Sequence, residues 1–321
     1  MSRLLITLVA YVSLISVAAA QTKWPDRPVT FVVPFAAGGN TDAVARVTAD
    51  YLQKTLNSPF VVENRGGGGG IVGTAQVARS SPDGYTFCVC SIGSITVASS
   101  LEKLTYDPLG DLEPISVLST NALAVVTPPA LGIDTVPELI RVAKAKPDSI
   151  EYGSSGVGGL MHISALLFQA RTGTTFTHVP FRGGAPAVGA ALANQVKLVF
   201  ANMSDALPQI EGGTLKALAV TTKARSPQLP NVPTLAEAGV ADFDVQSWNG
   251  LFAPKGTPKA VTDRLGAAIA AMAKDRDVVR RFATFGSETA ANTPERYREE
   301  LVAETAQWRE VLREAGLLKA H

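Results

Sequence analysis

Short apolar, β-branched runs alternate with helical stretches along the chain, separated by glycine-bearing loops. Val29–Val33 is the first such run, and a helix is predicted from about Thr41 to Leu56. A strand at Pro59–Glu63, a helix at Ile71–Arg79 and a strand at Thr86–Cys90 follow. This order of strands and helices predicts a parallel sheet with helical crossovers.

A second series of predicted strands begins near Leu123. Its strands are expected at residues 123–127, 150–153, 175–179, 196–200 and 216–221. Two capping boxes, Thr135 with Glu138 and Thr234 with Glu237, predict the starts of two helices in this series.

The last quarter of the chain holds one more predicted strand, at Gln246–Phe252, and is helical from there on. Thr257-Pro258 and Thr293-Pro294 predict two helix starts, each by a capping hydroxyl and a proline in the first turn. The predicted fold class is therefore α/β, with two parallel-sheet domains. We expect domain I to combine residues 21–121 and 246–321, domain II to span 122–245, and the chain to cross near 119–122 and 240–246.

The N-terminus reads as a secretory signal peptide over residues 1–20. Arg3 supplies the positive charge, Leu4–Val17 is apolar, and Ala18–Ala20 offers small residues for cleavage after Ala20. A transmembrane anchor would need about 20 apolar residues, and this run is shorter and carries two serines. The sequence therefore predicts export.

Charge excludes several classes of partner. The chain has 29 basic and 28 acidic residues, and loss of Arg3 with the signal leaves 28 of each. A neutral chain without basic clusters favours neither nucleic acid nor an anionic membrane surface. Any anion that binds must be held by local geometry.

Cys88 and Cys90 are the two cysteines, and both fall in a predicted strand. At i, i+2 in an extended strand the Cα atoms lie about 6.5–7 Å apart, at the limit for a disulfide. We therefore expect two buried free thiols. Three histidines in the chain, none near the pair in sequence, give little support for a metal site, and we predict no metal and no cofactor.

The loop after the first strand carries the pattern of an anion site. Gly38 and Gly39 let backbone N–H groups approach a ligand. Asn40 or Thr41 caps the following helix, whose free N–H groups can bind a carboxylate without a cation. Asp42 has two interpretations: its carboxylate can interact with the positive end of the helix dipole, or it can bind a hydroxyl or ammonium of a ligand.

Three further loops join a strand to a helix. They are Gly153–Gly159, Val179–Pro186 and Asn202–Asp205. Each by itself is also explained as an ordinary turn that needs glycine. Because the carboxyl ends of parallel strands meet at one edge of a sheet, where open α/β sheets bind ligands, we expect these loops to gather around a site.

Other chemistry-bearing motifs have weaker support. Gly66–Gly70 generates a G-x-G-x-x-G match, but the strand before it does not pass straight into glycine, so we interpret it as a flexible spacer. Ser154 lacks the spacing of a nucleophile elbow. His162 can be a general base or a capping and packing residue, and Arg182 can clamp a carboxylate or lie at the surface beside a turn.

With these motifs in view, the chain resembles the Bug family of periplasmic solute receptors, which are associated with tripartite tricarboxylate transporters. The resemblance spans the mature chain. It rests on residues 24–25 and 28, 33–39 with 42 and 45–46, 61–65, 83–86, 152–154 with 162, 179–183, 215–220, 232–234 with 237–239, and 248–254. Two positions depart from the family pattern: Ala37 stands where proline is common, and Phe181 replaces a frequent tyrosine.

The resemblance implies a two-lobe Venus-flytrap fold without enzymatic activity, whose ligand is held in the inter-lobe cleft by backbone N–H groups, hydroxyls and waters. The implied ligand-binding residues are Phe35, Ala37, Gly38, Gly39, Asn40, Thr41, Asp42, Ser91, Ser154, Ser155, Gly158, Gly159 and His162, with Arg182, Gly183, Gly184, Ala185 and Asp205 closing the site.

We therefore expect a monomeric periplasmic receptor that delivers a small mono-, di- or tricarboxylate to a tripartite tricarboxylate-type transporter. One alternative is a sensor of the same fold that docks on a signalling partner. Another is an exported α/β hydrolase or dehydrogenase, which turnover assays would detect.

Overall fold

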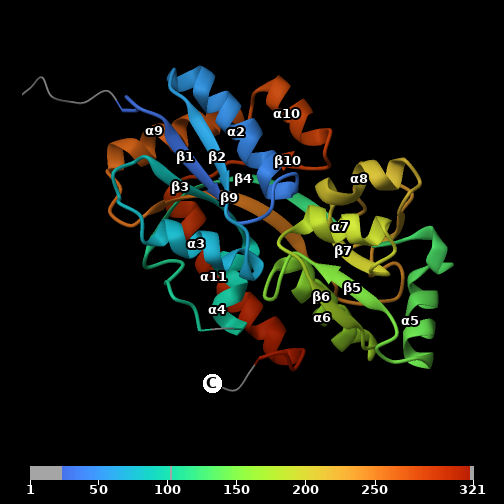
Figure 1. The fold of residues 1–321 in the computed structure, drawn as a ribbon. Helices are drawn as coiled ribbons and strands as arrows, with labels where there is room; N and C mark the ends of the chain where they lie inside the picture. Colours follow the sequence, from blue (N-terminus) through green and yellow to red (C-terminus); the bar gives the residue numbers. More distant parts are fainter. Residues whose placement is uncertain (1–23, 102, 319–321) are drawn as a thin grey trace, which may run out of the picture.

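The computed structural model describes residues 24–101 and 103–318. These residues form two lobes, which lie on the left and on the right of Figure 1, with strands running between them. The predicted signal peptide and its cleavage site lie outside the described residues. The two-lobe α/β architecture predicted from the sequence is confirmed.

The first lobe is built around three parallel strands. They are β1 (Val29–Val33), β2 (Phe60–Asn64) and β3 (Thr86–Ser91), with β1 in the centre. Phe31 on β1 places its ring 5.3 Å from that of Phe60 and 6.2 Å from that of Phe87, both edge to face. This aromatic contact joins the three strands in the core of the lobe.

Helices cover the two faces of this sheet. They are α2 (Asn40–Leu56), α3 (Ile71–Ala78), α4 (Ala98–Leu101), α9 (Lys259–Met272), α10 (Arg276–Ala283) and α11 (Pro294–Glu314), with the short helices η1 (Gly68–Gly70) and η2 (Gly93–Val97). The first helix begins one residue before its predicted start and ends at the predicted Leu56.

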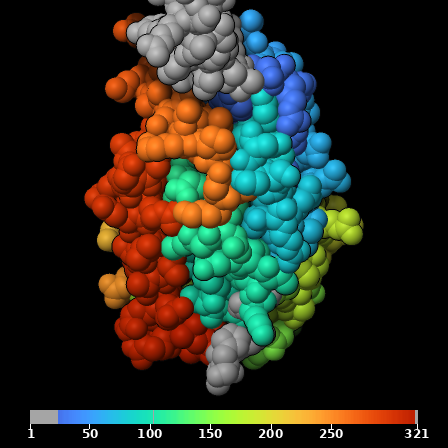
Figure 2. All heavy atoms as spheres, turned by 90° about the vertical axis from the view of Figure 1, so that its left-hand side faces the viewer, coloured from blue at the N-terminus to red at the C-terminus, as the bar shows by residue number. Residues whose placement is uncertain are grey.

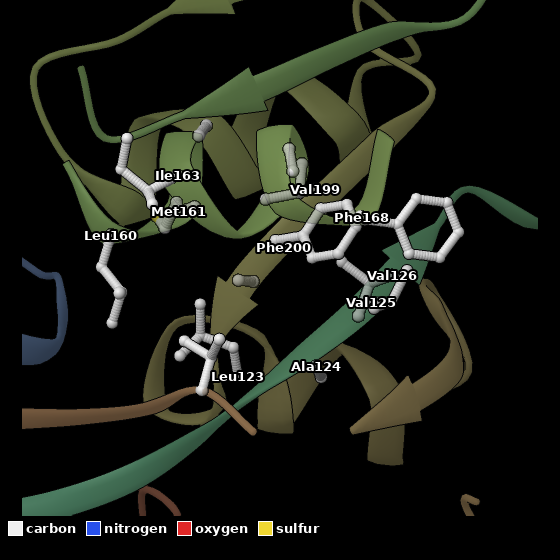
Figure 3. Close-up of a cluster of buried hydrophobic side chains, with 14 of the residues drawn as sticks. Leu123, Ala124, Val125, Val126, Leu160, Met161, Ile163, Phe168, Val199 and Phe200 are labelled. Carbon is white, nitrogen blue, oxygen red and sulfur yellow. The ribbon is translucent and has the colours of Figure 1, made fainter. Parts of the chain in front are cut away.

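The second lobe also consists of strands and covering helices, and it has four short strands. They are β5 (Glu151–Ser154), β6 (Thr177–Pro180), β7 (Leu198–Asn202) and β8 (Lys216–Val220), and its helices are η3 (Pro129–Leu131), α5 (Val136–Ala145), α6 (Leu160–Thr172), α7 (Gly184–Leu192) and α8 (Met203–Glu211). Figure 3 shows its apolar core, where Phe168 and Phe200 lie beside Val125 and Val126. Both phenylalanines are fully buried.

Two long strands connect the lobes. β4 (Leu112–Thr127) pairs with β9 (Gln246–Pro254) up to Ala122, and from Leu123 onward it pairs with β7 and β8. β9 is antiparallel to β3 as well as to β4, and the short β10 (Glu288–Thr289) is also antiparallel to β4. The sheets are therefore mixed. Strands β1 to β3 and β5 to β7 form the predicted parallel pairs, and the two connecting strands add antiparallel pairs that the sequence did not predict.

The change of pairing partner at residues 122 and 123 supports the predicted division into 21–121 plus 246–321 and 122–245, which we retain as a proposal. The predicted crossings lie on β4 and directly before the neighbouring strand β9. One crossing lies inside β4, which begins eleven residues before the strand predicted at Leu123. The other leads into β9 at Gln246.

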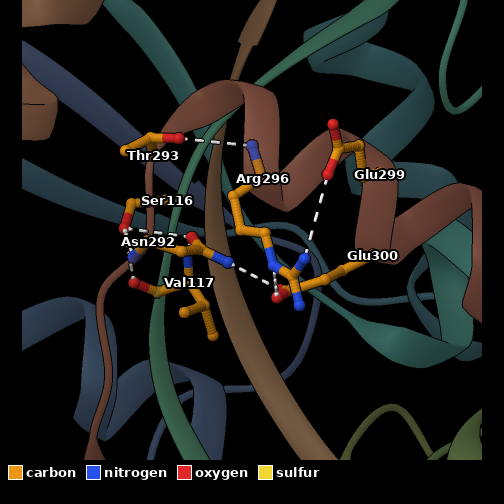
Figure 4. Close-up of polar contacts among 7 residues, drawn as sticks. All are labelled: Ser116, Val117, Asn292, Thr293, Arg296, Glu299 and Glu300. Atoms are coloured by element: carbon orange, nitrogen blue, oxygen red, sulfur yellow. Dashed lines mark hydrogen bonds and ion pairs between the residues drawn. The ribbon is translucent and has the colours of Figure 1, made fainter.

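The C-terminal helix α11 is tied to the first lobe at its start (Figure 4). Asn292 accepts a hydrogen bond from the backbone N–H of Val117 at 2.9 Å, and its own N–H donates to the Ser116 hydroxyl at 3.1 Å. Thr293 caps the helix through the N–H of Arg296, as predicted. Figure 2 shows α11, in red, side by side with the segment after β3, in green.

Two predicted helix starts differ in the structure. Thr234 and Glu237 make both bonds of a capping box, at 3.0 and 2.8 Å, yet the chain forms only a turn there. The backbone N–H of Gly239 already closes this turn onto Ala236, so no helix propagates. At α9 the cap residue is Pro258 itself rather than Thr257.

The two cysteines form a disulfide, so the expectation of free thiols is wrong. The Cα atoms of Cys88 and Cys90 lie 5.3 Å apart. That separation is shorter than the fully extended spacing assumed for an i, i+2 pair and lies within the usual range for a disulfide.

Within residues 24–101 and 103–318, none of the helices combines the length and the apolar character needed to cross a bilayer. The same residues contain no group of three or more His, Cys, Asp or Glu side chains arranged to hold a metal ion.

Candidate ligand-binding site

The first loop is held by the carboxylate of Asp42. Its oxygens accept hydrogen bonds from the N–H of Gly38 at 2.9 Å, from Arg46 Nε at 2.9 Å and from Asn64 Nδ2 at 3.0 Å. Burial acts to raise the pKa of Asp42, but the bonds from Arg46, Gly38 and Asn64 outweigh it and hold the pKa below its ordinary value. Asp42 is thus an ionised anchor that sets the path of the loop into α2.

The second loop is held by a serine and two stacked histidines. The Ser154 hydroxyl lies 2.7 Å from His178 Nε2 and accepts the N–H of Gly156 at 3.2 Å. The rings of His178 and His162 stack with centroids 4.1 Å apart. His162 Nδ1 accepts the N–H of Gly158 at 3.1 Å, which fixes the turn before α6.

The lowered pKa of His162 explains how its Nδ1 can accept the Gly158 N–H. Burial, with a smaller repulsion from His178, lowers the pKa of His162 to about 4. The ring is therefore neutral near pH 7, and a neutral ring leaves Nδ1 free to accept a hydrogen bond. This geometry matches the packing and capping interpretation of His162.

Three hydrogen bonds join the loops of the two lobes. The N–H of Ala36 donates to the carbonyl of Arg182 at 2.9 Å. The N–H of Asn40 donates to Asp205 Oδ1 at 2.7 Å, and Ser204 donates to Asn40 Oδ1 at 2.8 Å. The starts of α2, α7 and α8 therefore meet, so the cleft between the lobes is closed at this point.

The glycine run Gly66–Gly70 lies in the lobe contact and is not a free spacer, contrary to the sequence interpretation. Gly69 has φ +60°, and a Cβ there would overlap the carbonyl of Val157 and lie 2.6 Å from the N–H of Gly159. A Cβ on Gly66 would lie 2.8 Å from the carbonyl of Arg182. Backbone packs directly on backbone here, which only residues without a side chain allow.

A small cavity lies between the lobes. Its lining comes from the starts of α2, α6, α7 and α8 together with polar residues of β3 and β9: Phe35, Gly39, Asn40, Thr41, Ser91, Ser155, Leu160, Met161, Gly184, Asn202, Asp205 and Ser247. The space open to the centres of water molecules is ≈ 20 Å³, room for about one water. Among residues 24–101 and 103–318, no lysine or arginine lines it. A larger ligand would therefore need the lobes to separate before it could enter.

The structure gathers eight of the predicted site residues around this cavity, namely Phe35, Gly39, Asn40, Thr41, Ser91, Ser155, Gly184 and Asp205. The others hold the loops or lie outside the lining: Ala37, Gly38, Asp42, Ser154, Gly158, Gly159, His162, Arg182, Gly183 and Ala185. Arg182 contributes its backbone carbonyl to the lobe contact. That any of these residues binds a ligand stays a prediction.

Four lining residues were not among the predicted site residues. Asn202 lies in a loop that the sequence singled out, at the end of β7. Leu160 and Met161 are the first residues of α6, and their position follows from the glycine loop before them. Ser247 lies at the start of β9. The sequence signal that could have identified it is a polar residue in a strand predicted next to a domain crossing.

Two lobes joined by crossing strands, with helix starts of both lobes around one cavity, define the class of two-lobe solute-binding proteins. The model of the tripartite tricarboxylate transporter family receptor matches residues 44–317, and the chain belongs to this family. Its fold and family are those of periplasmic receptors, which are not enzymes.

Individual relatives agree with this membership. The chain is 36% identical to Protein BugT of Bordetella pertussis over 98% of both chains. The structure of R. palustris Rpa4515 with adipate has 34% identity and a TM-score of 0.89, covering 92% of this chain and 99% of that one. MatC of Rhodopseudomonas palustris with bound malate has 32% identity and a TM-score of 0.87, covering 90% and 100%.

Proposed function

We propose that this receptor binds a small carboxylate in the inter-lobe cleft and delivers it to a tripartite tricarboxylate-type membrane transporter. The observation that carries the proposal is the convergence of helix starts from both lobes on one cavity, whose described lining residues include no lysine or arginine. Free backbone N–H groups and the positive ends of helix dipoles bind anions in such a place. The hydroxyls of Thr41, Ser91 and Ser155 add further donors.

The relatives support the same ligand class. Adipate and malate, the ligands in two of the similar structures, are both dicarboxylates. The chain covers nearly the whole length of both proteins. We further propose that the protein acts as a monomer and that the signal peptide is cleaved after Ala20.

Thermal unfolding of the mature chain with mono-, di- and tricarboxylates tests the proposal. A ligand at 100 times its dissociation constant should raise the free energy of unfolding by about 2.7 kcal/mol. Malate and adipate serve as the first dicarboxylates, and amides of the same length serve as controls. A panel in which no carboxylate raises the unfolding midpoint more than its amide contradicts the proposal.

The Ser154–His178 contact also bears on the hydrolase alternative. A hydroxyl 2.7 Å from a histidine nitrogen is the contact that an acyl-transfer nucleophile needs. Ser154 is however fully buried and does not line the cavity, while its hydroxyl accepts the N–H of Gly156. This arrangement favours a role in holding the loop. Ester turnover that is abolished by Ser154→Ala would reverse this assignment.

A further inference from the structure

The carboxylate of Asp205 lies where a bound anion is expected. Asp205 belongs to the first turn of α8 in the second lobe, and its Oδ1 accepts the N–H of Asn40 in the first lobe at 2.7 Å. Asn40 is the first residue of α2, so this N–H is one of the free donors at the helix start. The protein's own carboxylate therefore occupies a donor that the proposed function assigns to the ligand.

The surroundings of Asp205 are shaped to hold this carboxylate. A Cβ on Gly39 would lie 3.3 Å from Oδ1, and a Cβ on Gly184 would overlap Oδ2. The carboxylate is thus enclosed between the starts of α2 and α7, and Asn202 donates to Oδ2 at 3.3 Å. Asp205 also lines the inter-lobe cavity.

The charge on Asp205 is poorly compensated by its neighbours. Burial raises the pKa of Asp205 to about 6, although the bonds from Asn40 and Asn202 act to lower it. Asp205 lies at the starts of α2, α7 and α8. The charged residues nearest in sequence to these starts are Asp42 on α2, Arg182 before α7 and, at the far end of α8, Glu211. Asp42 is committed to Arg46, and the hydrogen bonds to Asp205 come from the uncharged groups of Asn40 and Asn202.

We propose that Asp205 competes with the ligand's carboxylate for the start of α2, so that the receptor takes up a carboxylate together with one proton on Asp205. The proposal rests on the proposed function and names the residue that makes it sensitive to pH. A second ionised carboxylate in this enclosed space is repelled by an ionised Asp205, whereas a protonated Asp205 becomes a hydrogen-bond donor.

Proton uptake has a measurable signature in the affinity. Above the pKa of Asp205, each complex formed must take one proton from solution, so the dissociation constant should rise about tenfold per pH unit. Below the pKa the affinity should level off. The dissociation constant for a dicarboxylate such as malate or adipate is measured by calorimetry from about pH 6 to about pH 8.5, where small carboxylic acids stay ionised.

Asp205→Asn keeps an oxygen for the Asn40 N–H and removes the charge. In this variant the dissociation constant should become independent of pH, and at pH 8 it should be about tenfold or more below the wild-type value. Glu304→Gln is the matched control. Glu304 accepts the Trp248 Nε1–H at 3.0 Å and burial also raises its pKa to about 6, yet it lies on α11 and does not line the cavity.

The outcomes separate the two proposals. A pH-dependent affinity that is kept in Glu304→Gln and lost in Asp205→Asn supports competition. Carboxylate binding that is independent of pH in the wild type, or that is lost at every pH in a folded Asp205→Asn variant, overturns this inference and leaves the proposed function intact. A wild type that binds no carboxylate at any pH overturns both.

Discussion

Single glycines decide how closely the two lobes approach each other. Gly68 and Gly69 both have a positive φ, of +55° and +60°. An alanine at either position carries the cost of a left-handed conformation, about 1–2 kcal/mol. Only the methyl group at residue 69 would meet the opposite lobe, because the nearest atom to a Cβ at residue 68 is in Ile71, 3.6 Å away.

Gly69→Ala is therefore expected to weaken carboxylate binding by about tenfold or more, since a steric cost of about 1.4 kcal/mol in the closed form is already one factor of ten. Gly68→Ala, with the same backbone cost, should bind as the wild type does. Calorimetric titration of both variants measures the difference. Equal affinities in the two variants would show that the lobe contact at Gly69 does not contribute to closure around the ligand.

The neutral state of His162 makes stability depend on pH. The pKa of His162 is about 4 in the folded chain and about 6.5 in an unfolded chain. Between these pH values the unfolded state binds more protons, so the free energy of unfolding falls as the pH drops. We expect a loss of about 2 kcal/mol from this residue between pH 7 and pH 5.

Urea unfolding at the two pH values, on the wild type and on His162→Asn, measures this contribution. Asparagine keeps an acceptor for the Gly158 N–H but does not titrate. The variant should lose about 2 kcal/mol less than the wild type on acidification. An unchanged pH dependence in the variant would contradict the assignment to His162.

At the scale of elements, α11 shows how a C-terminal segment becomes part of the core. Tyr297, Leu301, Trp308 and Leu312 form its buried stripe. Trp248 on β9 packs edge to face on Tyr297 at 5.7 Å. The helix therefore completes a core to which the second lobe also contributes.

A chain that ends at residue 292 is expected to lose cooperative unfolding. Burying each of the four side chains contributes about 1.5–3 kcal/mol, and their sum is comparable to the whole stability of an ordinary domain, about 5–15 kcal/mol. Circular dichroism during heating tests this expectation. Val302→Ser changes an exposed position of the same helix and should unfold near the wild-type midpoint; a cooperative transition in the truncated chain would contradict the role of α11.

At the scale of the whole molecule, the two lobes meet through a few polar contacts and closely packed backbone. The N–H of Ala36 donates to the carbonyl of Arg182, the N–H of Asn40 donates to the carboxylate of Asp205, and glycines allow the close approach. Such a cleft suits a neutral chain, because helix starts supply positive potential without net charge. Closure then depends on shape and on the protonation of Asp205, and a ligand must replace contacts that the lobes already make with each other.

Local sequence patterns determined most of the helices and strands. The strands predicted at Val29–Val33 and Thr86–Cys90, the Thr135 capping box and the Thr293 cap all appear in the structure, the second strand being longer by Ser91. These signals depend on residues close together in the chain, which is why sequence alone identifies them. The alternation of strands and helices likewise determined the α/β class and the order of elements.

Only the tertiary structure decided which loop residues contact each other across the lobes, because these contacts depend on how elements far apart in sequence pack. The antiparallel direction of β4 and β9, the contact of Gly69 with the other lobe and the bond from Asn40 to Asp205 join residues far apart in sequence. The disulfide requires the Cα atoms of Cys88 and Cys90 to lie closer together than in an ideal strand, and in the structure they are 5.3 Å apart. The sequence thus determined the donors at the helix starts, and the packing of the lobes decided which donors face the cavity and which already hold the protein's own carboxylate.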